Sequence, residues 1–226
     1  MTQPAFVKLQ DSDLILASAS VTRAKLLGDA GLKFYQYSVA IDEAAVRAAG
    51  IAEGIPASDI AVMLAEMKAT AATQRLALEH PLPPAYILGC DQILVCDEKI
   101  YSKPKDIKEA RSQLLALTGK THQLLTAVVL FQHGERIWHH LSMADMIMRQ
   151  FDNEFINAYL AKLGDAALFS PGSYQIESIG IQLFSKINGC HYSILGIPLL
   201  EVMGILREHG LVPIKNKSLG ESELET

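Results

Sequence analysis

The chain has little of what marks a secreted, membrane-spanning or nucleic-acid-binding protein. Its three cysteines show neither metal-ligand spacing nor a paired disulfide set, so we expect reduced thiols. No apolar run reaches the roughly 18 residues of a membrane span, and no signal segment opens the chain. The net charge of −5 offers no basic surface to a polynucleotide. We therefore expect a cytoplasmic protein that has neither a membrane nor nucleic acid as a partner.

Several common catalytic and nucleotide-binding motifs are also missing. The chain has no G-x-x-x-x-G-K-[ST] loop, no G-x-G-x-x-G turn, no H-E-x-x-H helix and no G-x-S-x-G elbow. Its seven histidines show no ligand spacing. Half of the residues are hydrophobic and a fifth are charged, which is typical of a globular enzyme. At 226 residues the chain can form one large domain or two lobes around a cleft.

The hydrophobic pattern predicts a mixed α/β fold. Strands are expected at 13–17, 34–39, 85–89 with a continuation at 93–95, 121–131, 137–149 and 181–187. Helices are expected at 22–30, 58–78, 106–117, 152–163 and 198–209. Alternation in the first half and a hairpin in the middle favour a mixed sheet flanked by helices over a purely parallel one. We expect a polar lead-in at 1–12, a single domain at 13–211 and a polar tail at 212–226.

The segment from Leu14 to Leu27 has the pattern of an anion-binding corner. An apolar strand ends at Ser18 and Ser20, and a helix with Arg23 in its first turns follows at once. Either serine can cap the helix and leave backbone N–H groups and a positive dipole end for an anion. An ordinary capped helix has the same pattern, so the spacing alone leaves both interpretations open.

Asp91 is a carboxylate inside an apolar strand pattern. Buried without a partner it would cost several kcal/mol, so it must be paired, bound to a metal or placed at a strand end. The functional interpretations are a metal ligand and a general base for a water nucleophile. Lys103 follows in Ser102-Lys103-Pro104, where the proline favours an extended backbone. It is either a phosphate ligand at the same end of the sheet or a solvated surface lysine.

Three further candidates are weaker when taken singly. Asp42-Glu43 is expected in a loop after a strand, where carboxylates bind metals but are also common as exposed acids. Lys68 lies within the long predicted helix and is either functional or solvated. Glu177 follows a glycine-containing turn, where it either contacts the edge of a ligand or faces solvent.

Taken in order, these segments resemble the Maf family of nucleotide pyrophosphatases, whose fold is related to that of the inosine-triphosphate pyrophosphatases. The matching motifs run in register from about residue 13 to residue 211: Leu14-Ile15-Leu16-Ala17-Ser18-Ala19-Ser20 with Arg23, Ile41-Asp42-Glu43, Lys68-Ala69, Gly89-Cys90-Asp91-Gln92, Lys103-Pro104-Lys105-Asp106, Leu117-Thr118-Gly119-Lys120-Thr121-His122, Pro171-Gly172-Ser173-Tyr174 and Leu195-Gly196-Ile197-Pro198-Leu199. The resemblance implies a mixed twisted sheet flanked by helices, with two lobes around a central cleft.

The resemblance also implies a reaction, which is hydrolysis of a nucleoside triphosphate to the monophosphate and pyrophosphate. By position, Asp91 would accept the proton of the attacking water, and Glu43 with Asp91 would hold Mg²⁺ or Mn²⁺, which prefer oxygen ligands. The side chains that would bind the phosphates and stabilise their charge are Ser18, Arg23, Lys68 and Lys103.

The chain departs from the usual family pattern at the positions that concern the base. Many members have Pro-Arg-Arg after the second serine, where this chain has Val21-Thr22-Arg23 and so one cation fewer. Gln92 stands where Thr is frequent, and Glu177 where Gln is frequent. Gln92 and Glu177 resemble the subgroup that hydrolyses 7-methyl-GTP more than the dTTP/UTP subgroup, whereas Thr22 matches neither well. A carboxylate accepts hydrogen bonds from a guanine N1–H and amine, so a modified purine nucleotide is favoured.

Alternative functions remain open on the sequence. The family is also associated with inhibition of septum formation, so one alternative is a nucleotide-binding regulator of cell division with little catalysis. Two others are a dTTP/UTP pyrophosphatase and an inosine-triphosphate pyrophosphatase, although the latter would lack the Ser-Ala-Ser opening. The resemblance also makes a homodimer plausible.

Overall fold

A seven-stranded mixed sheet forms the centre of the molecule. The computed structural model describes residues 13–80 and 85–212, so the predicted lead-in and most of the predicted tail lie outside the described residues. The strand order is β2-β1-β3-β5-β6-β7, and β4 pairs with β3. Because β1 runs parallel to β2 and β3 while every other pair is antiparallel, the prediction of a mixed sheet is confirmed. The strands are β1 (Leu14–Ala17), β2 (Tyr35–Gln36), β3 (Tyr86–Cys96), β4 (Lys99–Tyr101), β5 (Thr121–Gln132), β6 (Glu135–Met148) and β7 (Phe184–Asn188).

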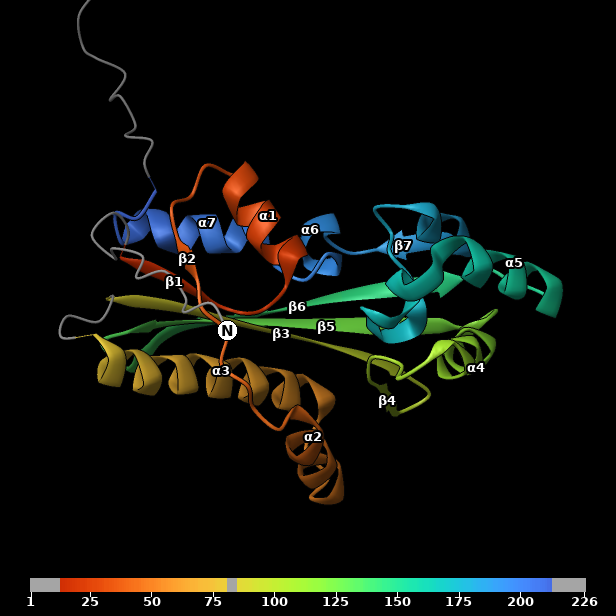
Figure 1. Cartoon of the computed structure of the whole chain (residues 1–226), viewed down its shortest axis with the longest axis horizontal. Helices are drawn as coiled ribbons and strands as arrows, with labels where there is room; N and C mark the ends of the chain where they lie inside the picture. The colour runs from red at the N-terminus through yellow and green to blue at the C-terminus, as the bar shows by residue number, and fades with distance from the viewer. Residues whose placement is uncertain (1–12, 81–84, 213–226) are drawn as a thin grey trace, which may run out of the picture.

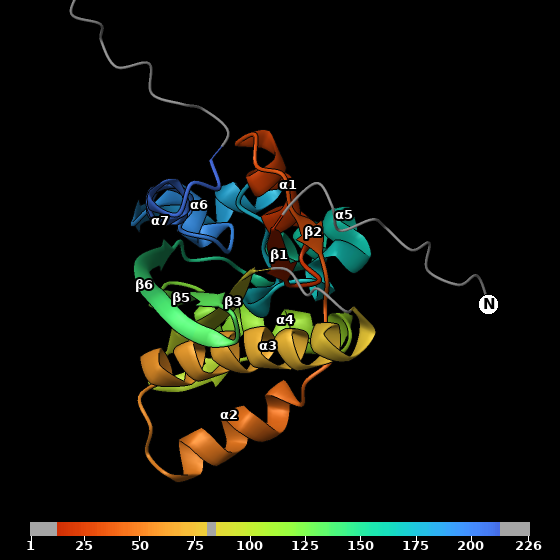
Figure 2. The same ribbon diagram turned by 90° about the vertical axis from the view of Figure 1, so that its left-hand side faces the viewer.

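Helices cover both faces of the sheet. In Figures 1 and 2, α3 lies against one face with α2 outside it, whereas α1 and α7 lie on the opposite face. The α-helices are α1 (Val21–Asp29), α2 (Glu43–Ala52), α3 (Ala57–Glu79), α4 (Ile107–Leu117), α5 (Asn153–Leu163), α6 (His191–Ile194) and α7 (Leu199–Glu208). Three short 3₁₀ helices follow α5 and precede β7: η2 (Gly164–Leu168), η3 (Pro171–Ser173) and η4 (Ile179–Leu183). None of the helices within the described ranges is long and apolar enough to cross a membrane.

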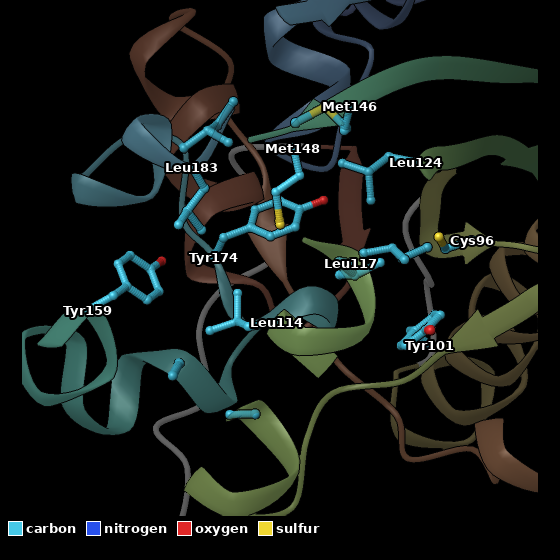
Figure 3. Close-up of a cluster of buried hydrophobic side chains, with 14 of the residues drawn as sticks. Cys96, Tyr101, Leu114, Leu117, Leu124, Met146, Met148, Tyr159, Tyr174 and Leu183 are labelled. Carbon is cyan, nitrogen blue, oxygen red and sulfur yellow. The ribbon is translucent and has the colours of Figure 1, made fainter. Parts of the chain in front are cut away.

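The hydrophobic core has three parts. One lies between α3 and the sheet and includes Ile60, Leu64 and Ile93. A second lies on the opposite face, under α1 and α7. The third lies toward the other end of the sheet, where α4, α5 and the 3₁₀ segments meet β5 and β6, and Figure 3 shows Leu114 and Tyr174 within it. The two ends of the sheet therefore pack against separate hydrophobic clusters.

One edge of β3 is left open in its middle. On the side away from β5, β1 pairs with β3 only as far as Gly89, and β4 pairs with it only from Leu94 onward. Residues 90–93 therefore have no strand partner on that side, although β5 pairs with them on the other. Because side chains alternate along a strand, this opening lets residues from both faces of β3 reach the same space.

The structure corrects several predicted elements. Asp42-Glu43 does not lie in a loop, because Asp42 caps α2 by accepting a hydrogen bond from the Ala45 N–H, and Glu43 begins the helix. The second strand is limited to Tyr35–Gln36. β3 runs through Asp91 without interruption, since the backbone continues to pair with β5 there. The predicted strand at 181–187 begins only at Phe184, after a 3₁₀ turn.

The close contact between α3 and β3 depends on Gly89. A Cβ at this position would lie 2.3 Å from the Ala65 carbonyl oxygen and 3.0 Å from the Ala69 Cβ. We expect Gly89→Ala to lower the free energy of unfolding by about 1–3 kcal/mol, because the helix must move away from the strand. Urea denaturation measures the change. Gly28→Ala is the control, because a Cβ added at this helical position would meet no atom of a neighbouring element within 4 Å. This substitution should be neutral or stabilising.

Candidate active site

A cavity of about 620 Å³ opens at the unpaired edge of β3. Its volume lies in the range that holds a small molecule such as a nucleotide. The predicted site residues Thr22, Arg23, Glu43, Lys68, Asp91, Gln92, Lys103 and Glu177 all line it. They come from α1, α2, α3, β3 and two loops, so the tertiary structure brings together residues that are far apart in the sequence. Ser18 is the exception, because it lies behind Arg23 and does not line the cavity.

Lys68 joins two carboxylates at the floor of the cavity. Its Nζ lies 2.6 Å from Asp91 Oδ1 and 2.7 Å from Glu43 Oε1. The Asp91 side chain is 5% exposed and that of Lys68 is 14% exposed, so these charges are largely removed from water. A buried pair of this kind is stable only if each charge keeps its partner. Asp91 Oδ2 has no hydrogen-bond partner and is buried.

Arg47 is a cavity cation that the sequence analysis missed. Its Nη2 donates to Glu43 Oε2 at 2.6 Å, from one turn further along α2. Burial alone would raise the pKa of Glu43, but the hydrogen bonds and charges of Lys68 and then Arg47 outweigh it and hold that pKa below its usual value. The i, i+4 spacing of Glu43 and Arg47 would have indicated this pair if residues 43–52 had been recognised as a helix.

Arg23 fills the opening beside β3. Its Nε donates to the Gly196 carbonyl at 2.7 Å, and its Nη1 donates to the Cys90 carbonyl at 3.1 Å and to Ser18 Oγ at 3.0 Å. The Cys90 carbonyl lies in the part of β3 that has no strand partner on this side. Arg23 therefore replaces a missing strand bond with a side-chain bond and keeps a guanidinium at the cavity wall.

The two serines of the opening motif have separate tasks. Ser20 is the N-cap of α1, where its Oγ accepts from the Arg23 N–H at 3.3 Å. Ser18 is buried and orients the Arg23 guanidinium instead. The predicted phosphate contact of Ser18 stays a prediction.

Gln92 lies on the face of β3 opposite to that of Asp91. The hydrogen-bond partners of its side-chain amide determine which way the amide points. Its Nε2 donates to the carbonyls of Ser193 and Ile194 at 3.0 and 3.1 Å and to Thr126 Oγ1 at 2.8 Å. Because the two carbonyls can only accept, the nitrogen must point toward α6. The oxygen Oε1 has no partner among the described residues, so Gln92 offers the cavity a hydrogen-bond acceptor.

The remaining predicted residues lie on the outer walls. Lys103 is exposed, lines the cavity beside Lys105, and forms no ion pair with the residues that the structure describes. Glu177 lies in the turn between η3 and η4, exposed to solvent at the rim rather than on a strand. Thr22 lines the cavity from the first turn of α1, whereas its neighbour Val21 points outward and is 79% exposed.

The carboxylates present fit a hard divalent cation. Within residues 13–80 and 85–212, no group of three His, Cys, Asp or Glu side chains is placed to hold a metal. Mg²⁺, however, is commonly bound by one or two carboxylates together with substrate phosphates. Glu43 and Asp91 converge on one point at Lys68, and the free oxygen Asp91 Oδ2 is a ligand atom without another partner.

Comparison with known proteins identifies the family of the chain. A family model described as Maf-like protein matches residues 13–209. The chain belongs to the Maf family.

Its curated relatives cover most of the chain. A protein of Brucella abortus biovar 1 (strain 9-941) named 7-methyl-GTP pyrophosphatase is 45% identical over 194 residues, which are 86% of this chain and 94% of the relative. A nucleoside triphosphate pyrophosphatase of Rhodospirillum rubrum is 43% identical over 199 residues, 88% of this chain and 96% of the relative. A 7-methyl-GTP pyrophosphatase of Mesorhizobium japonicum is 43% identical over 199 residues, 88% and 97% of the two chains.

The ion pairs of Glu43 predict a pH-dependent contribution to stability. Since its pKa is depressed in the fold, the folded state binds a proton less tightly than the unfolded chain does. The ionised Glu43 stabilises the folded state fully when the pH is above the pKa of an ordinary carboxyl group. This stabilisation is lost as the pH falls through the lower pKa that Glu43 has in the folded state. Wild type should have a higher free energy of unfolding than Glu43→Gln. We expect this difference to be larger at about pH 7 than at about pH 4.

Urea denaturation of both proteins at the two pH values measures this difference. Glu53→Gln is the control, because Glu53 lies at the exposed end of α2 and forms no ion pair among the described residues. At about pH 7 the control substitution should change the free energy of unfolding by much less than Glu43→Gln does. A Glu43→Gln difference that does not change with pH would contradict the assigned ion pairs.

Proposed function

We propose that this protein hydrolyses a nucleoside triphosphate to the monophosphate and pyrophosphate, and that it prefers a modified purine such as 7-methyl-GTP. The observation that carries the proposal is the placement of Asp91, a carboxylate in the middle of a buried strand at an open edge, in a nucleotide-sized cavity. Burial of a carboxylate in this position lowers the stability of the fold unless the group is paired, and a functional role explains why such a group is present. The names of the relatives, nucleoside triphosphate pyrophosphatase and 7-methyl-GTP pyrophosphatase, support the reaction class.

Asp91 is assigned as the base that accepts the proton of the attacking water. The water oxygen attacks the α-phosphorus, the bond from that phosphorus to the bridging oxygen breaks, and pyrophosphate leaves. Lys68 Nζ lies 2.6 Å from Asp91 Oδ1 and gives this buried side chain a charged partner, and a carboxylate is a group that can accept the proton of a water nucleophile. Because Oδ1 is paired with Lys68, the unpartnered Oδ2 is the Asp91 oxygen assigned to take the proton.

Cations around the same cavity bind the triphosphate. Arg23 is held rigidly by two backbone carbonyls and Ser18, so its position is set before the substrate arrives. Lys103 and Arg47 lie on other walls, and positive charge on several sides of the phosphates stabilises the charge that develops as pyrophosphate leaves. An overall charge of −5 is compatible with this, because the cations are concentrated in one cavity.

The acceptor atoms of the cavity support a guanine-type base. Gln92 offers only its oxygen, and Glu177 adds a carboxylate at the rim. A guanine presents the N1–H and the exocyclic amine as adjacent donors, which two acceptors can bind. Uracil and thymine present one donor between two acceptors, so they match this pair of groups less well.

We further propose that Glu43 and Asp91 hold Mg²⁺ or Mn²⁺, a cation that supplies charge stabilisation to the phosphates when bound. We also place the protein in the cytoplasm, where its three cysteines, all free in the structure, would stay reduced. Burial raises the pKa of Cys90 to about 11, so this thiol is neutral and unreactive. A homodimer remains an expectation from the family.

The proposed base predicts the effect of Asp91→Asn. Incubation of the protein with dTTP, UTP, CTP, GTP, 7-methyl-GTP and ITP, with Mg²⁺ or Mn²⁺, should release pyrophosphate from one or two of them. Asp91→Asn should lower kcat by at least about a hundredfold, because it removes the base with little change in volume. Asp97→Asn is a matched control, since Asp97 is 70% exposed and its ion pair, with Lys120, lies at the surface.

The two results separate the candidate functions. Normal turnover by Asp91→Asn would remove Asp91 from the mechanism. Nucleotide binding without pyrophosphate release by wild type would favour the regulator of septum formation over the enzyme. Turnover confined to dTTP and UTP would contradict the purine preference while keeping the reaction.

The assignment of Glu177 to base recognition predicts a change in selectivity. Glu177→Gln should lower kcat/KM for the preferred purine nucleotide relative to UTP by about tenfold, because one acceptor becomes an amide that also donates. The kcat for the best substrate should change much less. Glu135→Gln, at the exposed first residue of β6, should leave the substrate profile unchanged. An unchanged profile for Glu177→Gln would exclude Glu177 from base recognition.

A further inference from the structure

Gln113 lies outside the cavity but hydrogen-bonds to two of its walls. It is a polar residue on the inner face of α4, and it is only 6% exposed. Its Nε2 donates to the Ser102 carbonyl at 2.9 Å. Its Oε1 accepts from the Gly172 N–H at 2.9 Å. Both ends of one buried amide are therefore used, each on the backbone of a different loop.

Each of the two loops carries cavity residues of a different kind. Ser102 immediately precedes Lys103, on the wall assigned to the phosphates. Gly172 belongs to η3, and the chain continues from there to Tyr174 and Glu177 on the wall assigned to the base. Gln113 thus links the loop of Lys103 to the segment that leads to Glu177 through two direct hydrogen bonds.

The segment at Gly172 and Ser173 has two successive residues with positive φ. Gly172 has φ +74°, and a Cβ there would lie 2.6 Å from Tyr174 Cε1 and 2.8 Å from Leu94 Cδ1. Ser173 also has a positive φ of +59°, which is strained for a residue with a side chain, and its buried Oγ has no partner. Strain of this kind persists only where the surroundings impose it.

Other buried polar contacts fix the same loop. The Tyr174 hydroxyl lies 2.8 Å from His122 Nε2, and the Tyr159 hydroxyl donates to the Ser173 carbonyl at 3.3 Å. Burial lowers the pKa of His122 to about 4, so the ring is neutral at physiological pH. Figure 3 shows Tyr174 and Tyr159 in the same cluster as Leu114, the neighbour of Gln113 on α4. Of these contacts, the one made by Gln113 also reaches the Lys103 loop.

We propose that Gln113 is a positioning residue for the reaction: its amide sets the spacing between the Lys103 loop and the Glu177 segment, and so the fit of triphosphate and base in one cavity. The proposal rests on the proposed function for what the two walls bind. A helix with a fixed start is a suitable anchor, because Asp106 caps α4 by accepting from the Glu109 N–H at 2.7 Å. Misplacement of a binding group by about 1 Å can cost a hundredfold in rate.

Two substitutions separate positioning from a general contribution to stability. Gln113→Met keeps the volume but makes neither hydrogen bond. We expect it to raise KM and to weaken the binding of inorganic tripolyphosphate, measured by calorimetry, by about tenfold each. Ile156→Val is the control, because it removes a methylene from the core cluster beside α4 and leaves the two hydrogen bonds of Gln113 in place. It should lower Tm and leave KM and tripolyphosphate binding as in wild type.

Gln113→Glu adds a pH test. An ionised carboxylate can accept from the Gly172 N–H but cannot donate to the Ser102 carbonyl, whereas the protonated acid can do both. Burial favours the neutral form, so lowering the pH should restore the missing donor. At about pH 8 we expect kcat/KM of Gln113→Glu to be about tenfold lower than that of wild type. At about pH 5.5 the ratio of the two values should rise severalfold. Gln113→Met should show no such recovery.

The outcomes distinguish this inference from the proposed function. If wild type releases pyrophosphate from no nucleotide, the proposed function fails. The positioning role is wrong if Gln113→Met binds tripolyphosphate as tightly as wild type does. It is also wrong if Gln113→Met and Ile156→Val have the same Tm and lose the same amount of tripolyphosphate affinity. Both conclusions hold independently of the measured turnover. A Gln113→Glu to wild-type ratio that does not change with pH would also overturn it.

Discussion

Asp91 places a carboxylate in the middle of a strand that is buried on both faces, and its contact with Lys68 is what makes that position tolerable. The Nζ lies 2.6 Å from Oδ1, and without it a charge would remain buried and unpaired. This contact requires that α3 lie close against β3, which in turn requires a residue without a side chain at Gly89. The packing of one helix and the chemistry of the cavity therefore depend on the same few atoms.

The second requirement is the opening in the sheet. Had β1 continued past Gly89, its backbone would have occupied the place of Arg23, and Asp91 and Gln92 would have faced two unconnected sides of a continuous sheet. Because β1 ends and β4 begins only opposite Leu94, one cavity receives side chains from both faces of β3. Side chains alternate between the two faces of β3, so Asp91 and Gln92 enter this cavity from opposite sides. Asp91 turns toward Lys68 of α3, and Gln92 turns toward the carbonyls of α6.

Much of this site could be predicted from the sequence, although the reasons differ from residue to residue. The Ser20 cap, the break before α1 and the charge within an apolar strand are local signals, and they led to Arg23 and Asp91. Arg47 does not follow from the sequence pattern, because the pattern around Asp42 indicates a loop, whereas in the structure Asp42 is the cap of a helix. Gln113 was missed because nothing local marks a glutamine as buried. Only its two partners, at Ser102 and Gly172, reveal its place.

The sequence by itself determined the order and the types of most elements, because periodicity and capping act over a few neighbouring residues. It also determined the membership of the Maf family, since the motifs lie in register along the chain. Only the tertiary structure decided that β3 is open between Gly89 and Leu94, that Ser18 lies behind Arg23, and that the amide of Gln92 offers its oxygen. These features depend on where strands end relative to one another and on partners far away in the chain, and no local pattern specifies either.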